Sequence, residues 1–248
     1  MYHERFVEVL GVRISRVNKN DVFSQISGAL SGGSPITVFT PNPEIVMRAQ
    51  KDKALKNALK SADLLLADGV GIMIASRLLG DPLPERITGI DTGELTLAYA
   101  AERGIPIFLL GAKHGVAERA AREIRARYSD IRIVGTHHGY FEKAGAQNDA
   151  VIQKINDSGA EVLIVCFGAP LQETWISENK KRLESVKLYL ALGGALDVWA
   201  KDVRRAPKIF QKIGLEWLWR IIKEPRRAGF ILKMPPFLCK VLCRKISN

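Results

Sequence analysis

The stretch VLIVCF (Val162–Phe167), followed at once by GAPLQE (Gly168–Glu173), decides the fold class of this chain. Six consecutive apolar residues suit a strand that is buried on both of its faces. A helical pattern follows over Leu171–Arg182. Apolar strands that alternate with amphipathic helices are typical of a parallel sheet with helices on both sides. This stretch therefore predicts one unit of an α/β fold.

The same alternation runs through the first 200 residues. Further apolar runs predict strands at Ile36–Phe39, Leu64–Leu66, Ile105–Leu110, Ile131–Val134 and Leu188–Leu192. Helical patterns lie between them, at Glu44–Lys60, Val70–Leu79, Thr92–Glu102, Gly115–Tyr128 and Ala150–Ser158. Phe6–Val17, with Gly11 in its middle, predicts a small N-terminal β-hairpin. We expect residues 1–200 to form a Rossmann-like parallel sheet covered by helices on both faces.

Composition excludes several classes of protein. The chain has 248 residues, of which 47% are hydrophobic and 25% charged, so wholesale disorder is excluded. Its apolar runs are far shorter than the roughly 18–20 residues of a membrane span. No apolar segment follows Met1, so we expect no signal peptide. The three cysteines show no zinc-like pairing, which favours a reducing cytoplasm.

The positive charge is concentrated at the C-terminus. Residues 201–248 hold 13 Lys+Arg and 3 Asp+Glu, a net of +10 out of +11 for the whole chain. Apolar residues such as Trp217 and Trp219 separate these charges, which favours a membrane surface over nucleic acid. For residues 207–222, a helix packed on the body with a solvated basic face is an equal alternative. For residues 226–245, which Pro235-Pro236 should break, we expect membrane contact rather than a core helix.

Ligands of open parallel sheets bind beyond the carboxyl ends of the strands. Five of the six segments that follow the predicted strands contain glycine, as close approach to a phosphate or a sugar would require. Asp68 follows one of these strands and precedes a helix, so it is either a helix N-cap or a general base at a cleft. Thr40 and Asn42 either face a sugar or form an ordinary capping turn, which their spacing alone favours.

Other side chains leave fewer functions open. Arg86 could bind a phosphate or carboxylate, or pair with Asp91 or Glu85. His137 and His138 are adjacent and lack other ligands at metal-binding spacing, so we expect no metal site. The chain has no Asp-x-Asp motif for a diphosphate-bound metal and no Walker A motif. It also lacks the nucleophile elbow of hydrolases and the full glycine motif of dinucleotide-binding folds.

Five motifs in register resemble the WecG/TagA/CpsF glycosyltransferase family from about Val9 to the end of the chain. They are TPNPE (Thr40–Glu44), ADGVG (Ala67–Gly71), ERITG (Glu85–Gly89), GAPLQE (Gly168–Glu173) and GGALD (Gly193–Asp197). The tail looks most like the teichoic acid branch of the family. The resemblance implies an inverting transferase that moves N-acetylmannosamine from UDP to the 4-hydroxyl of GlcNAc-diphospho-undecaprenol, without a metal or another cofactor.

The resemblance also implies a role for each matching residue. Asp68 would be the catalytic base, and the substrate-binding residues would be Thr40, Asn42, Arg86, Tyr140, Gln172, Asp197, Arg220, Arg226 and Arg227. Tyr140 and Asp197 would hold the uridine. Arg220, with Arg226 or Arg227, would neutralise the diphosphate from the C-terminal appendage, residues 201–248.

The implied partners are a UDP-sugar, the lipid-linked GlcNAc and an anionic membrane surface, with no nucleic acid. We therefore expect a cytoplasmic protein associated peripherally with the inner face of the cell membrane. Two alternatives stay open. One is another donor, such as the uronic acid of N-acetylmannosamine or an exopolysaccharide sugar. The other is a non-enzymatic protein that binds membranes or nucleic acid.

Overall fold

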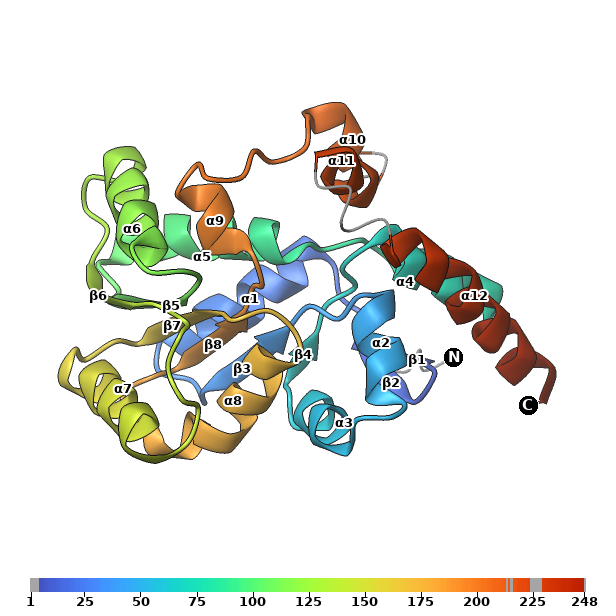
Figure 1. Cartoon of the computed structure of the whole chain (residues 1–248), viewed down its shortest axis with the longest axis horizontal. Helices are drawn as coiled ribbons and strands as arrows, with labels where there is room; N and C mark the ends of the chain where they lie inside the picture. The colour runs from blue at the N-terminus through green and yellow to red at the C-terminus, as the bar shows by residue number, and fades with distance from the viewer. Residues whose placement is uncertain (1–4, 213, 215, 224–228, 248) are drawn as a thin grey trace.

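The computed structural model describes residues 5–247, apart from residues 213, 215 and 224–228. Its centre is a six-stranded sheet in the order β4-β3-β8-β7-β5-β6, and every neighbouring pair is parallel (Figure 1). The strands are β3 (Ile36–Phe39), β4 (Leu64–Leu65), β5 (Ile107–Gly111), β6 (Ile133–His137), β7 (Val162–Cys166) and β8 (Leu188–Ala191). The predicted parallel sheet is therefore confirmed.

Helices cover both faces of the sheet, as predicted. One apolar cluster joins the sheet to α1 (Lys19–Leu30), α5 (Gly89–Arg103), α6 (Val116–Arg127) and α9 (Ala195–Trp199). The other joins it to α2 (Pro43–Ala49), α3 (Lys53–Lys60), α4 (Val70–Leu78), α7 (Gly145–Asp157) and α8 (Leu171–Asn179). The short helix η1 (Lys180–Arg182) continues α8. The buried strands thus have apolar neighbours on either side, which explains their continuous apolar sequence.

The predicted N-terminal hairpin is present as β1 (Phe6–Val9) paired antiparallel with β2 (Val12–Ser15). The predicted helix Glu44–Lys60 is wrong as a single helix, because α2 and α3 are separate. Asn42 caps α2 and Asp52 caps α3, each by accepting a backbone N–H in the first turn. Because Asp52 caps a new helix start, the chain forms two helices even though apolar residues continue at helical spacing. The prediction also omits α1, which starts with a capping box of Asn18 and Asp21.

Three helices follow the body: α10 (Lys208–Lys212), α11 (Glu216–Lys223) and α12 (Gly229–Ser247). In Figure 1, α10 and α11 project from the body, whereas α12 lies along α4. The predicted break at Pro235-Pro236 is wrong, because α12 runs through both prolines. It packs on α2 and α4 and buries Phe237 and Val241 completely. Among the described residues, no helix has the length and apolarity needed to span a membrane.

Candidate active site

A cleft of about 1490 Å³ opens at the carboxyl ends of the parallel strands. Every strand of the six-stranded sheet contributes residues from the loop that follows it. The chain leaves β5 toward β6 on one side and β7 toward β8 on the other, and ligands bind at such a reversal in strand order. Pockets for one small ligand usually measure about 300–1,000 Å³, so this cleft has room for two substrates.

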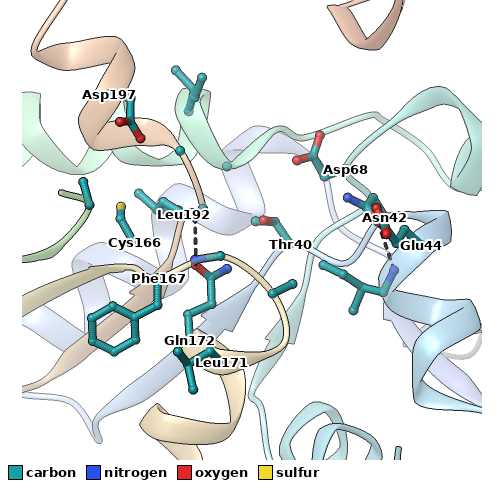
Figure 2. Close-up of a pocket in the computed structure, with 18 of the residues that line it drawn as sticks. Thr40, Asn42, Glu44, Asp68, Cys166, Phe167, Leu171, Gln172, Leu192 and Asp197 are labelled. Carbon is teal, nitrogen blue, oxygen red and sulfur yellow. Dashed lines mark hydrogen bonds between the residues drawn. The ribbon is translucent and has the colours of Figure 1, made fainter. Parts of the chain in front are cut away.

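The strand order gives the cleft two ends. The loops after β3 and β4 form one, which we call the Asp68 end; the loop after β6, with Tyr140, forms the other, the Tyr140 end. Figure 2 shows Asp68 and Asn42 on one side, Asp197 on the opposite side, and Thr40 between them. The structure therefore brings together residues that lie far apart in the sequence.

Asp68 lines the cleft and is partly buried. It is not the N-cap residue of α4, because Gly69 occupies that position and no side chain caps the helix. Gly69 has a φ of +93°, which glycine adopts without steric cost. The capping alternative for Asp68 is therefore wrong. A carboxylate on the wall of such a cleft can accept the proton of a substrate hydroxyl.

Thr40 and Asn42 lie beside this carboxylate. Thr40 is buried, and its hydroxyl donates a 3.5 Å hydrogen bond to the carbonyl oxygen of Ala191. Asn42 caps α2, since its Oδ1 accepts the backbone N–H of Ile45 at 3.0 Å. The capping alternative for Asn42 is thus right, yet the residue also lines the cleft. A carboxamide that caps through its oxygen keeps an NH₂ group that can donate to a sugar.

Gln172 connects two loops that form the floor of the cleft. Its side chain is only 3% exposed, and Oε1 accepts backbone N–H groups from Gly168 at 3.2 Å and Gly193 at 3.0 Å (Figure 2). Its Nε2 donates to Oε1 of Glu173 at 2.9 Å, which fixes the orientation of the amide. Burial raises the pKa of Glu173. The structure shows Gln172 as a clamp between the loops after β7 and β8, a function that the sequence does not reveal.

Tyr140 and Asp197 line the opposite part of the cleft. Tyr140 is 63% exposed in the loop after β6, and Asp197 lies in the first turn of α9. Lys143 lies in the same loop as Tyr140, lines the cleft and contacts the Phe167 ring of the loop after β7; none of the sequence motifs includes it. Burial lowers the pKa of Lys143 to about 8. In the sequence, Lys143 is marked only by being a basic residue between a predicted strand and a predicted helix.

Arg86 also lines the cleft, but neither of its predicted ion-pair partners contacts it. It pairs instead with Glu216 at 3.8 Å, and its Nη2 donates to the carbonyl oxygen of Gln211 at 2.6 Å. Both partners belong to the C-terminal appendage. The alternatives of an ion pair with Asp91 or Glu85 are wrong because folding brings a carboxylate from 130 positions away.

A second arginine extends this contact. Arg205 donates to Asp91 at 2.6 Å and lies 3.4 Å from Glu216. Burial alone would raise the pKa of Asp91, but hydrogen bonds from Arg205 and Thr88, and the charge of Arg205, outweigh it and lower the pKa. These ion pairs fasten the start of α11 to the body beside the cleft.

The structure does not place the three side chains expected at the diphosphate, those of Arg220, Arg226 and Arg227. Arg226 and Arg227 lie outside the described residues, and Arg220 belongs to α11 with a side chain outside them.

At the Tyr140 end, His138 stacks against His114 with ring centroids 3.6 Å apart. Within the described part of the chain, no group of three His, Cys, Asp or Glu residues is arranged to hold a metal ion.

Comparison with known proteins identifies the family. The model of the glycosyl transferase WecG/TagA/CpsF family matches residues 7–248. The chain belongs to this family. Two relatives from Staphylococcus aureus, strains MRSA252 and MW2, are each 32% identical to it over 237 residues. Each alignment covers 95% of this chain and 91% of the relative.

Both relatives are named N-acetylglucosaminyldiphosphoundecaprenol N-acetyl-β-D-mannosaminyltransferase. The family match over residues 7–248 includes all six strands of the parallel sheet and the cleft residues described above. This WecG/TagA/CpsF member is therefore a glycosyltransferase whose cleft is built from loops at the carboxyl edge of a parallel sheet.

Proposed function

We propose that this chain transfers N-acetylmannosamine from UDP to the 4-hydroxyl of GlcNAc-diphospho-undecaprenol, with inversion at the anomeric carbon. The name that the two relatives share supports the acceptor and the transferred sugar. The observation that carries the mechanism is the position of Asp68, at one end of a cleft large enough for two substrates.

In this mechanism the acceptor sugar lies at the Asp68 end and the nucleotide at the Tyr140 end. Asp68 takes the proton of the 4-hydroxyl while that oxygen forms a bond to the anomeric carbon. The bond from the anomeric carbon to the diphosphate oxygen breaks, and its electron pair leaves with UDP. Thr40 and Asn42 contact the transferred sugar, Tyr140 and Asp197 hold the uridine, and Gln172 keeps the floor of the cleft in place.

Negative charge grows on the diphosphate as UDP leaves, so fixed positive charge there lowers the barrier. We propose that Arg86 and the appendage arginines Arg220 and Arg226 or Arg227 supply that charge without a metal. For Arg86 this requires the diphosphate to replace Glu216 as its partner. Arg86 lies 3.8 Å from Glu216 at the start of α11, the helix that contains Arg220, which supports the proposal.

The experiment uses purified full-length protein, UDP-N-acetylmannosamine and a short-chain GlcNAc-diphosphate lipid, with and without EDTA. We expect mass spectrometry to show a lipid heavier by one N-acetylhexosamine in both conditions. Parallel reactions with other UDP-sugars test the donor. Transfer from another sugar alone would refute the proposed donor, and loss of transfer with EDTA would refute the mechanism without a metal.

Asp68→Asn tests the base. We expect it to keep UDP binding and to lower kcat by about 10²–10⁴-fold, the usual effect of losing a general base. Asp52→Asn is the matched control, because Asp52 caps α3 and asparagine caps equally well. Near-normal turnover by Asp68→Asn would refute the proposed role.

We further propose that the appendage, residues 201–248, contacts the anionic inner face of the cell membrane. Exposed Lys240 and Lys245 lie on α12 near the exposed apolar residues Leu242 and Ile246, which supports this proposal. Deleting the appendage is a poor test, because it would uncover the surface that Phe237 covers.

The sharper test replaces charges on the exposed side of α12. We expect Lys240→Glu with Lys245→Glu to reduce sedimentation with phosphatidylglycerol vesicles at low salt. The control is Arg122→Glu with Lys181→Glu, which changes the net charge equally at exposed positions of α6 and η1. Equal losses in both variants would show that net charge, not α12, governs binding.

A further inference from the structure

Lys143 makes an unusual set of contacts in the loop between β6 and α7, residues 138–144. Its Nζ donates to the carbonyl oxygens of Gly139 at 2.7 Å and Phe141 at 2.8 Å. The same ammonium lies 3.5 Å from the ring centroid of Phe141 and 4.4 Å from that of Phe167. An ammonium that lies over aromatic faces is attracted by the negative charge of the ring faces. Four contacts therefore converge on one side chain.

These contacts enclose Tyr140. The two carbonyl groups that accept from Lys143 belong to the residues immediately before and after it. Gly139 is held from the other side, since its N–H donates to Ala112 at 2.8 Å. A Cβ atom at Gly139 would lie 3.0 Å from the Phe167 ring, so the loop packs closely against its neighbour. The exposed Tyr140 side chain thus stands at the tip of a loop folded around the ammonium.

We propose that Lys143 is a positioning residue that holds Tyr140 at the nucleotide end of the cleft. The inference rests on the proposed function, in which that end receives the uridine of UDP. A loop that exposes an aromatic ring would otherwise sample many conformations, and ordering it on binding would cost affinity. Lys143 fixes the loop beforehand by joining it to Phe167 in the loop after β7.

The charge of Lys143 gives this arrangement a pH dependence. Burial lowers its pKa to about 8, so the ammonium loses its proton between pH 7 and pH 9, where binding can be measured. The neutral amine no longer attracts the two aromatic faces as a cation. The loop should therefore loosen, and UDP should bind more weakly, as pH rises from 7 to 9.

Other ionisable groups face the same loop. His137 ends β6 and His138 begins the loop, and burial lowers the pKa of each, which favours their neutral forms. His114 stacks on His138, and Glu118 and Lys154 both reach Thr136 of β6. Glu142 belongs to the loop itself and donates its N–H to Gln147.

The test compares Lys143→Met and Lys143→Arg in the full chain, with UDP as the probe in calorimetry at pH 7 and pH 9. We expect Lys143→Met to weaken UDP binding at pH 7 by about tenfold and to remove its dependence on pH. Lys143→Arg should bind UDP nearly as wild type does at both pH values, because arginine stays charged. Lys154→Met, which removes a nearby charge outside the cleft lining, is the control and should behave as wild type.

Two further measurements separate positioning from direct contact with the nucleotide. Without ligand, Lys143→Met should speed amide hydrogen exchange in residues 138–144 but not elsewhere. In a Tyr140→Ala background it should weaken UDP binding no further, because its effect acts through that ring. The proposal would be overturned if Lys143→Met left the exchange of residues 138–144 unchanged. It would also be overturned if Lys143→Met weakened UDP binding as much in the Tyr140→Ala variant as in wild type. If wild-type protein fails to bind UDP, the proposed function fails, whereas the exchange measurement still decides whether Lys143 holds the loop.

Discussion

Replacing Gln172 with leucine should loosen the floor of the cleft. Leucine has a similar volume but cannot accept the N–H groups of Gly168 and Gly193. An unsatisfied buried donor costs about 1–3 kcal/mol, and these two lie beside a cleft that water can enter, so the lower value applies to each. Glu173 also loses the amide that donates to it, so we expect the free energy of unfolding to fall by about 2 kcal/mol or more. For a chain of this length, that corresponds to a Tm lower by about 4–8 °C.

Thermal unfolding by circular dichroism measures the change, and transfer kinetics measure its effect on the cleft. Because both loops line the cleft, we expect a higher KM for the donor together with a lower kcat. The control is Gln153→Leu, which removes an exposed hydrogen bond to Asp157 on α7 and should shift Tm little. A Gln172→Leu protein with the Tm and kinetics of the control would refute the clamp.

Two further predictions concern α12 and the start of α11. Gly71→Ala places a Cβ atom 2.5 Å from Pro43 Cγ and 2.9 Å from Met234, so it should disturb the packing of α4 against α2 and α12, cost about 1–3 kcal/mol and speed limited proteolysis there. Gly28→Ala, with open space around the new Cβ, should be neutral or stabilising, and equal behaviour of the two variants would contradict this packing. Asp91→Asn should lower the Tm by no more than about 2–4 °C at pH 7, because a partly exposed pair with Arg205 contributes about 1 kcal/mol or less. Because the pKa of Asp91 is lowered on folding, this contribution is fully present above the unfolded pKa of about 3.9 and is lost as pH falls through the lower folded pKa. The difference in Tm between wild type and variant should therefore shrink in acid, and a difference that grows as pH falls would contradict the assignment.

The sheet could be predicted from sequence because its strands are buried on both faces and therefore continuously apolar. The prediction was least accurate at the edge strand β6, which is observed at Ile133–His137 rather than Ile131–Val134. Most of β6 is only partly buried, so polar residues such as Thr136 and His137 are tolerated and the apolar run ends early. The break between α2 and α3 could not be predicted in the same way, because apolar residues recur at helical spacing from one helix into the next.

The candidate site was predictable where its residues follow strands. The rule that ligands bind at the carboxyl ends selects Thr40 and Asp68, and both line the cleft. It could not reveal the partner of Arg86 or the contacts of Lys143, because Glu216 and Phe167 approach them only after folding. Motif spacing describes which loops carry a site but not which side chains hold those loops together.

The order of the strands also sets when the cleft can form. β8 is the last strand along the chain, yet it lies between β3 and β7 in the middle of the sheet. Before residues 188–191 emerge from the ribosome, β3 with β4 and β7 with β5 and β6 have no strand to join them. The loop with Asp68 belongs to the first group and the loop with Tyr140 to the second. A growing chain therefore carries two half-sites at unfixed separation, and they become one site when β8 pairs with both groups.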